Sequence, residues 1–138
     1  MLFDLKPGTV IRYPYLWRRE AQRGETEGRK IRPVCLAIAM PHKGKTYLFL
    51  LPISSQPPAG GQTALEVPEL ELRRIGLSEA KQAWITVSEF NRDIAEDSFY
   101  YEPGVKALGR FSNPFLLKIL KAALPCFKSQ NARIDRNA

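Results

Sequence analysis

The sequence has few of the side chains that build metal centres and disulfide frameworks. Among its 138 residues there are two cysteines, Cys35 and Cys126, and one histidine, His42. These residues are isolated from one another and lack the spacing of a zinc site. We therefore expect no metal and no other cofactor. Because a reducing cytoplasm disfavours disulfides, we expect both cysteines to be buried free thiols.

Long apolar runs and a secretory leader are also missing. No stretch approaches the roughly 20 apolar residues that cross a bilayer, and residues 1–4 lack the basic start and apolar core of a signal peptide. The sequence thus predicts a cytoplasmic location without membrane association. Hydrophobic residues make up 44% of the chain and charged residues 25%, which is the balance of a soluble globular protein. The length fits a single domain.

Acidic residues are scarce towards both ends of the chain, and the net charge is +7. Residues 1–61 hold ten Lys and Arg against four Asp and Glu, and residues 99–138 hold seven against two. Residues 62–98 reverse the balance, with four basic against eight acidic residues. This asymmetry favours a protein with one basic surface for a polyanion such as nucleic acid and an acidic surface elsewhere.

Most of the chain consists of short segments with strand character. They are rich in β-branched and aromatic residues, are separated by turn-forming residues, and cover 8–17, 31–40, 46–53, 63–67 and 83–87. The segment 31–40 is apolar almost throughout, which is typical of a strand buried on both faces. Short strands with tight turns predict a small, strongly curved antiparallel β-barrel of SH3-like size.

Helical signals are confined to two places. Residues 69–75, followed by Gly76, predict one or two helical turns that end at a glycine. A longer amphipathic helix is predicted over about 113–125, with Asn113 as N-cap and Pro114 at the first helical position. The fold class is therefore mainly β with a C-terminal helix. The domain spans residues 1–127, and the polar residues 128–138 are expected to form a flexible tail.

Residues 18–30 contain almost no apolar side chains and include two glycines. This composition predicts a loop that can cover a binding site. Its cations are either solvated or guide the phosphates of a nucleic acid, and they are Arg18, Arg19, Arg23, Arg29 and Lys30. Trp17, just before the loop, either stacks on a base or packs in the core.

Two of the predicted strands bring polar side chains to one rim. The segments 31–40 and 46–53 are joined by a short turn, so we expect them to pair antiparallel. The start of one strand then lies beside the end of the other. We therefore expect Arg32, Ser54 and Ser55 to share one rim of the domain.

Several short motifs lie in these segments. They are Gly8-Thr9-Val10-Ile11, Gly28 in the polar loop, Arg32-Pro33-Val34 and Pro52-Ile53-Ser54-Ser55-Gln56. Over residues 7–90 the chain resembles the PemK/MazF family of type II toxin–antitoxin endoribonucleases. The resemblance implies a PemK-type barrel that forms a homodimer, cleaves single-stranded RNA and binds a cognate antitoxin.

The resemblance also implies roles for individual residues. Cleavage of RNA without a metal uses the 2′-hydroxyl as nucleophile and leaves a 2′,3′-cyclic phosphate and a 5′-hydroxyl. Arg32 would stabilise phosphoryl charge, and Ser54 would bind a phosphoryl oxygen or the 2′-hydroxyl. As proton acceptors we favour Glu20 and Glu25, because their loop can fold over the rim. His42 is expected at the opposite end of its strands.

The residues expected to bind RNA are Arg18, Arg19, Arg23, Arg29, Lys30, Ser55, Gln56 and Trp17. Two departures from the family pattern keep other functions open. Many members have an acidic residue before the glutamine of the fifth strand, where this chain has Lys81, and the spacing from Gly28 to Arg32 is two residues longer. These departures favour an inactive module of the same fold that binds nucleic acid or protein. Glu89 is either a further proton acceptor or a turn residue.

Overall fold

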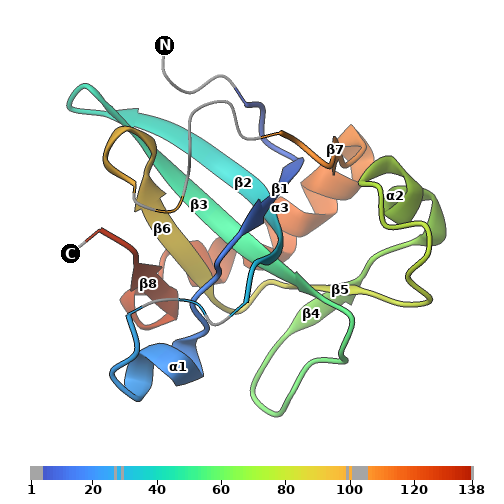
Figure 1. The fold of residues 1–138 in the computed structure, drawn as a ribbon, viewed down its shortest axis with the longest axis horizontal. Coiled ribbons are helices and arrows are strands. Elements are labelled where there is room, and N and C mark those ends of the chain that lie inside the picture. The colour runs from blue at the N-terminus through green and yellow to red at the C-terminus, as the bar shows by residue number, and fades with distance from the viewer. Residues whose placement is uncertain (1–4, 27, 29, 99, 101–105, 138) are drawn as a thin grey trace.

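The computed structural model describes residues 5–137 except 27, 29, 99 and 101–105. The strands are β1 (Thr9–Tyr13), β2 (Arg32–His42), β3 (Lys45–Ser54), β4 (Ala64–Glu66), β5 (Trp84–Thr86), β6 (Phe90–Ile94), β7 (Gly109–Arg110) and β8 (Arg133–Asp135). The helices are α1 (Arg18–Gln22), α2 (Glu69–Arg74) and α3 (Asn113–Phe127), with short 3-10 turns at η1 (Ala95–Asp97) and η2 (Gln130–Ala132). Figure 1 shows these elements around one sheet.

The architecture is mainly antiparallel β with a C-terminal helix in a single small domain, as predicted. Neighbouring strands follow the order β4-β5-β3-β2-β1-β7, while β6 pairs with β3 and β8 pairs parallel to β6. The long β2–β3 hairpin turns at Lys43 and Gly44, which both have positive φ (50° and 78°), as a two-residue hairpin turn requires. Within the described residues the sheet does not return to its first strand, so the predicted barrel closure is not found.

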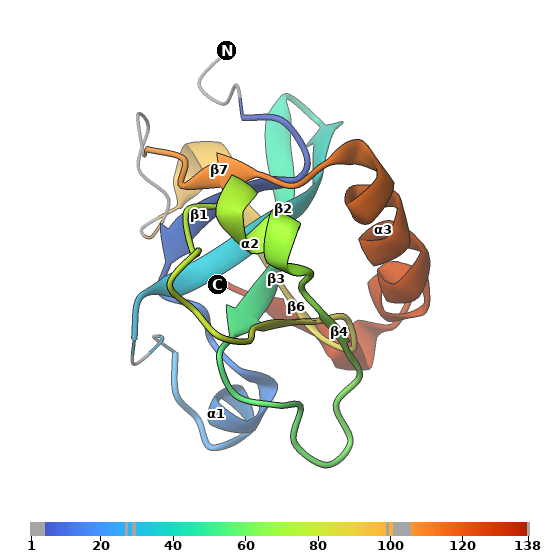
Figure 2. The ribbon, with the colours of Figure 1, turned by 90° about the vertical axis from the view of Figure 1, so that its right-hand side faces the viewer.

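Strand β2 is buried on both faces in its first half, which confirms the interpretation of its apolar run. Val34 and Leu36 belong to one hydrophobic cluster, and Cys35 and Ala37 belong to the other. Figure 2 shows α3 beside the sheet, and residues of α3 such as Ile119 complete the cluster around Cys35. Cys35 and Cys126 are buried free thiols, as expected, and burial raises the pKa of Cys35 to about 12.

Helix α3 begins one residue away from the predicted cap. The hydroxyl oxygen of Ser112, and not the side chain of Asn113, accepts a hydrogen bond from the Phe115 backbone N–H at 3.3 Å. Ser112 is held in turn by Glu71 of α2, whose carboxylate accepts from its hydroxyl at 2.7 Å and from its N–H at 2.9 Å. The helix therefore starts where α2 fixes it, and it continues past Pro125 to Phe127.

The prediction of a flexible polar tail at 128–138 is wrong for the described part of that segment. It forms η2 and β8, and β8 pairs with β6. Arg136 is 6% exposed and donates to the Pro14 carbonyl oxygen at 2.7 Å and to Asn91 Oδ1 at 3.0 Å. Polarity suggested solvation, but the tail is ordered because β6 offers it an unpaired edge and buried acceptors.

Two other segments differ from prediction. Residues 18–22, expected to belong to a loop, form the short helix α1, because Glu20 Oε1 accepts from the Trp17 backbone N–H at 3.0 Å and supports the first turn. Residues 90–94, for which no strand was predicted, form β6, which pairs with β3. The positions of α1 and β6 both matter for the site described next.

Candidate nucleic-acid groove

Arg32 and Ser54 come together as the sequence predicted. Arg32 begins β2 and Ser54 ends β3. The antiparallel register pairs Val34 with Pro52, and two residues further along it position 32 lies opposite position 54. Both side chains line the same two hollows, of about 400 and 270 Å³. Ser55 lines the larger of these hollows, so the predicted common rim is confirmed.

A third hollow of about 270 Å³ continues this depression. It shares Arg19, Ala59 and Gln62 with the smaller of the two hollows that Arg32 and Ser54 line. That smaller hollow shares Arg32 and Ser54 with the larger one, so it lies between the other two. We call the three together the groove. It runs between α1 and the start of β2 on one side and the loop 55–63 on the other. In both views α1 and this loop lie at the same end of the molecule (Figure 1 and Figure 2).

The groove is basic along one wall. Arg18, Arg19, Lys30 and Arg32 all line it. Of the other cations predicted to bind RNA, Arg23 is exposed in the segment after α1, and Arg29 lies outside the described residues. Four cations along one depression form the kind of track that a phosphate backbone follows.

Arg32 is held against an aromatic ring. Its guanidinium carbon lies 5.1 Å from the centre of the Trp17 ring, and that of Arg19 lies 4.8 Å from the same ring. Burial lowers the pKa of Arg32, and the nearby Glu20 carboxylate opposes that shift. An arginine stays charged through such a shift. Its Nε is buried without a hydrogen-bond partner in the described structure, so ring stacking and Glu20 position the group.

Trp17 acts as a support in this arrangement. Its side chain is 4% exposed, and its ring meets that of Tyr15 edge-to-face at 5.1 Å. A covered ring has no free face for a base, so the structure favours core packing over the predicted base stacking. Trp17 contributes to the groove by positioning Arg19 and Arg32.

Ser54 and Gln56 form the opposite wall beside Arg32. The Ser54 hydroxyl oxygen accepts from the Gln56 backbone N–H at 3.0 Å, which is the turn-forming role that serine often has at such positions. A hydroxyl that accepts a hydrogen bond keeps its own proton for donation. Ser54 can therefore stabilise the loop and still donate to a phosphoryl oxygen in the groove.

Glu20 and Glu25, the favoured proton acceptors, lie differently from expectation. Glu20 is 6% exposed, and its carboxylate is directed towards the Trp17 backbone N–H and the Arg32 charge. Glu25 follows α1 and is partly buried, with its backbone N–H bonded to the Glu20 carbonyl oxygen at 3.1 Å. The structure thus gives Glu20 a supporting role beneath the wall of the groove.

Glu89 is the acidic residue that sequence reasoning left undecided. It stands directly before β6, is 6% exposed, and lines the groove together with Arg18 and Arg19. Burial raises the pKa of its carboxyl group, while hydrogen bonds from Arg18 and Tyr15 and the two arginine charges act in the opposite direction. No periodic pattern in the sequence predicts β6, so the sequence alone could not show on which side of the sheet the Glu89 side chain lies.

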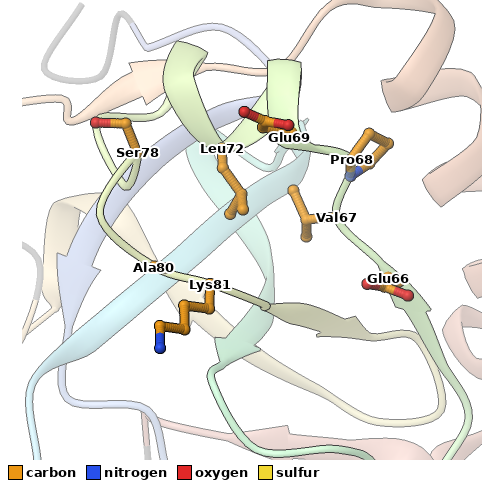
Figure 3. Close-up of a pocket in the computed structure, with 8 residues that line it drawn as sticks. All are labelled: Glu66, Val67, Pro68, Glu69, Leu72, Ser78, Ala80 and Lys81. Carbon is orange, nitrogen blue, oxygen red and sulfur yellow. The ribbon is translucent and has the colours of Figure 1, made fainter.

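A second cavity of about 580 Å³ lies beside α2 (Figure 3) and adjoins the groove at Ala80. Val67 and Leu72 are its buried apolar residues, and Glu66 and Glu69 give it acidic edges. Lys81, the residue at which the chain departs from the resembled family, also lines this cavity. The acidic middle segment of the chain therefore supplies two carboxylates to the edge of this cavity.

Other signs of function are few in the described part of the chain. No group of three or more His, Cys, Asp and Glu residues there is arranged to hold a metal ion. None of the helices described there has the length and apolar character needed to cross a membrane. In comparisons with known proteins, no family model, curated protein or solved structure matches this chain. A functional argument therefore depends on the groove itself.

Proposed function

We propose that the protein is a metal-independent endoribonuclease that cleaves single-stranded RNA, acting as the toxin of a type II toxin–antitoxin pair. The observation that carries the proposal is the meeting of Arg32 and Ser54 in a groove whose wall holds three further cations. The motif resemblance supports the same assignment and the finer fold type, an SH3-like barrel of the PemK kind. Homodimerisation, a cytoplasmic location and binding of a cognate antitoxin belong to this proposal.

The groove residues divide the chemistry between them. The ribose 2′-hydroxyl attacks the adjacent phosphorus, and the bond from phosphorus to the 5′-oxygen breaks. Arg32 stabilises the charge on the phosphoryl oxygens through its planar donor fork. The Ser54 hydroxyl donates a hydrogen bond to a phosphoryl oxygen or orients the attacking 2′-hydroxyl. Arg18, Arg19 and Lys30 bind neighbouring phosphates and hold the strand in line.

The decisive experiment incubates the purified protein with a long unstructured RNA in EDTA. We expect fragments with 2′,3′-cyclic phosphate and 5′-hydroxyl ends. Arg32→Ala should lower the cleavage rate by about 100-fold or more, because loss of one charge-stabilising donor typically costs that much. Lys118→Ala, which removes an exposed charge on α3, should cleave like the wild type.

Either of two results would reject the proposal. In one, the wild-type protein leaves the RNA intact; in the other, Arg32→Ala cleaves at the wild-type rate. Circular dichroism of Arg32→Ala checks that the fold is retained, which we expect because the residue is partly exposed at a rim.

A second candidate function is RNA binding without cleavage. It is favoured by one observation: Glu20, expected to take up a proton, is buried beneath the groove wall with its carboxylate on a backbone N–H. In the same experiment this function gives an intact RNA band with shifted mobility. A third class, a protein-binding adaptor, would show no RNA affinity even at low salt.

A further inference from the structure

Glu89 is the only acidic residue among the described residues that line the groove. A lone carboxylate on a wall of arginines is attracted to its neighbours but competes with phosphate for them. Such a position weakens binding of a polyanion, so the carboxylate is expected to serve the fold, the reaction or both. Its placement therefore calls for a chemical reason.

The carboxylate is held in one orientation. Oε1 accepts from the Tyr15 hydroxyl at 3.0 Å and from the Arg18 backbone N–H at 3.0 Å. Within the described residues both hydrogen bonds to this carboxylate end on Oε1, so Oε2 keeps its capacity to accept in the hollow that Glu89 lines. The neighbours are fixed as well, since Phe90 is 1% exposed and the Ser88 hydroxyl oxygen accepts from the Thr63 N–H at 3.0 Å.

Arg19 connects Glu89 to the cleavage centre. It lines both the hollow of Glu89 and the hollow of Arg32 and Ser54. Burial raises the pKa of the Glu89 carboxyl and lowers that of the Arg32 guanidinium; the Arg19 charge opposes the first shift and adds to the second. An RNA strand that occupies the hollow of Arg32 and Ser54 would therefore pass Arg19 into the adjoining hollow, which Glu89 lines.

We propose that Glu89 is the proton acceptor of the reaction, taking the proton of the ribose 2′-hydroxyl as that oxygen attacks phosphorus. This inference rests on the proposed function. The proton moves to Oε2, the new bond from the 2′-oxygen to phosphorus forms, and the 5′-oxygen leaves with the electron pair and takes a proton from water. Glu89 is returned to its charged form when the proton passes to solvent. The same residue anchors α1 through Oε1, so it couples the arginine wall to the reacting group.

The environment suits this task. A general base works best when its pKa approaches the working pH, and burial moves the Glu89 carboxyl in that direction. The carboxylate must be charged to act. The cleavage rate should therefore fall as the pH drops through the pKa of Glu89. This fall is the acidic limb of the pH–rate profile, and its midpoint should lie above the ordinary pKa of a glutamate.

Glu89→Gln gives the sharpest test, since the amide oxygen can still accept from Tyr15 and Arg18 but cannot take up a proton. We expect kcat to fall by about 100- to 10,000-fold, KM to stay within about threefold of the wild type, and the acidic limb to disappear. Glu89→Asp should recover part of the rate and keep a limb. Glu66→Gln, in the second cavity, serves as the matched control and should keep both the rate and the limb.

The inference is overturned if Glu89→Gln cleaves RNA at the wild-type rate, or more slowly but with the acidic limb intact. Those outcomes leave the proposed function standing, because the wild type still cleaves; an inactive wild type removes the proposed function and this inference together. Should Glu89→Gln fail to fold, carbon NMR titration of the Glu89 carboxyl in the wild-type protein replaces it. Agreement between its pKa and the acidic limb supports the assignment, and a clear mismatch rejects it.

Discussion

Arg32 carries its charge against the Trp17 ring, with Arg19 over the same ring. Burial is the main cause that lowers the pKa of Arg32, and repulsion from the Arg19 charge adds to it. Binding of a phosphate between them relieves the repulsion, which gives the pair a reason to bind an anion. A lysine could not replace Arg32 here, because it offers neither the planar fork nor the same stacking geometry.

Ser54 allows a prediction at the same scale. Ser54→Ala should lower kcat by roughly 10- to 100-fold, the value of one hydrogen bond to a charged group, whereas Ser54→Thr keeps the hydroxyl and most of the rate. Steady-state cleavage of a short fluorogenic RNA measures both. Ser78→Ala, which removes a hydroxyl in the second cavity, is the control.

If the alanine and threonine variants of Ser54 cleave equally well, the hydroxyl has only its turn-forming role. Thermal melting distinguishes the two roles further. Loss of the acceptor for the Gln56 N–H should lower the melting temperature. If Ser54 also acts in catalysis, the cleavage rate of Ser54→Ala falls even at temperatures where the variant is fully folded.

At the scale of elements, strand β8 ties the C-terminal segment to the groove. Arg136, directly after β8, donates to the Pro14 carbonyl oxygen and to Asn91 Oδ1, and its guanidinium carbon lies 4.0 Å from the centre of the Tyr100 ring. Asn91 also accepts from the Leu16 N–H at 2.9 Å and donates to the Leu16 carbonyl oxygen at 2.8 Å. Through these bonds β6 and β8 hold the chain that leads into Trp17 and α1.

We therefore expect Arg136→Ala to reduce the free energy of unfolding by about 3 kcal/mol, because it leaves buried acceptors without their charged donor. Urea denaturation followed by tryptophan fluorescence measures the change. Lys128→Ala, an exposed charge before η2, should change the stability by less than about 0.5 kcal/mol. Equal stability of the two variants would contradict the ordered C-terminal strand.

Across the described surface, the groove and the second cavity differ in charge. The basic wall of the groove is formed by residues 18–32, whereas the acidic edges of the second cavity come from Glu66 and Glu69. A basic track of this kind attracts a polyanion from solution and directs it to one place.

The salt dependence of RNA affinity tests this arrangement. With the uncleavable 2′-O-methyl RNA, four groove cations predict a slope of log affinity against log salt near about −3 for a single strand. Lys30→Ala should make the slope less negative by about 0.7, and the distant control Lys121→Ala on α3 should leave it unchanged. Identical slopes for the two variants would remove the groove as the binding surface.

Features that depend on local contacts could be predicted from the sequence. The hairpin of β2 and β3 is joined by a tight turn, so the meeting of Arg32 with Ser54 followed from antiparallel pairing of adjacent segments. The helix over 113–125 was visible because its apolar side chains recur at helical spacing. Both signals lie within a short window of residues, where periodicity and turn chemistry are decisive.

The rest of the fold depends on contacts between segments far apart in the sequence. β6 and β8 are short strands with polar residues, and they form because each meets a distant edge: β6 pairs with β3, and β8 pairs with β6. The Glu89 carboxylate is held by the hydroxyl of Tyr15, which lies 74 residues away in the sequence. Such long-range contacts leave no periodic trace in a single sequence, since the partner that orders the segment lies far away along the chain.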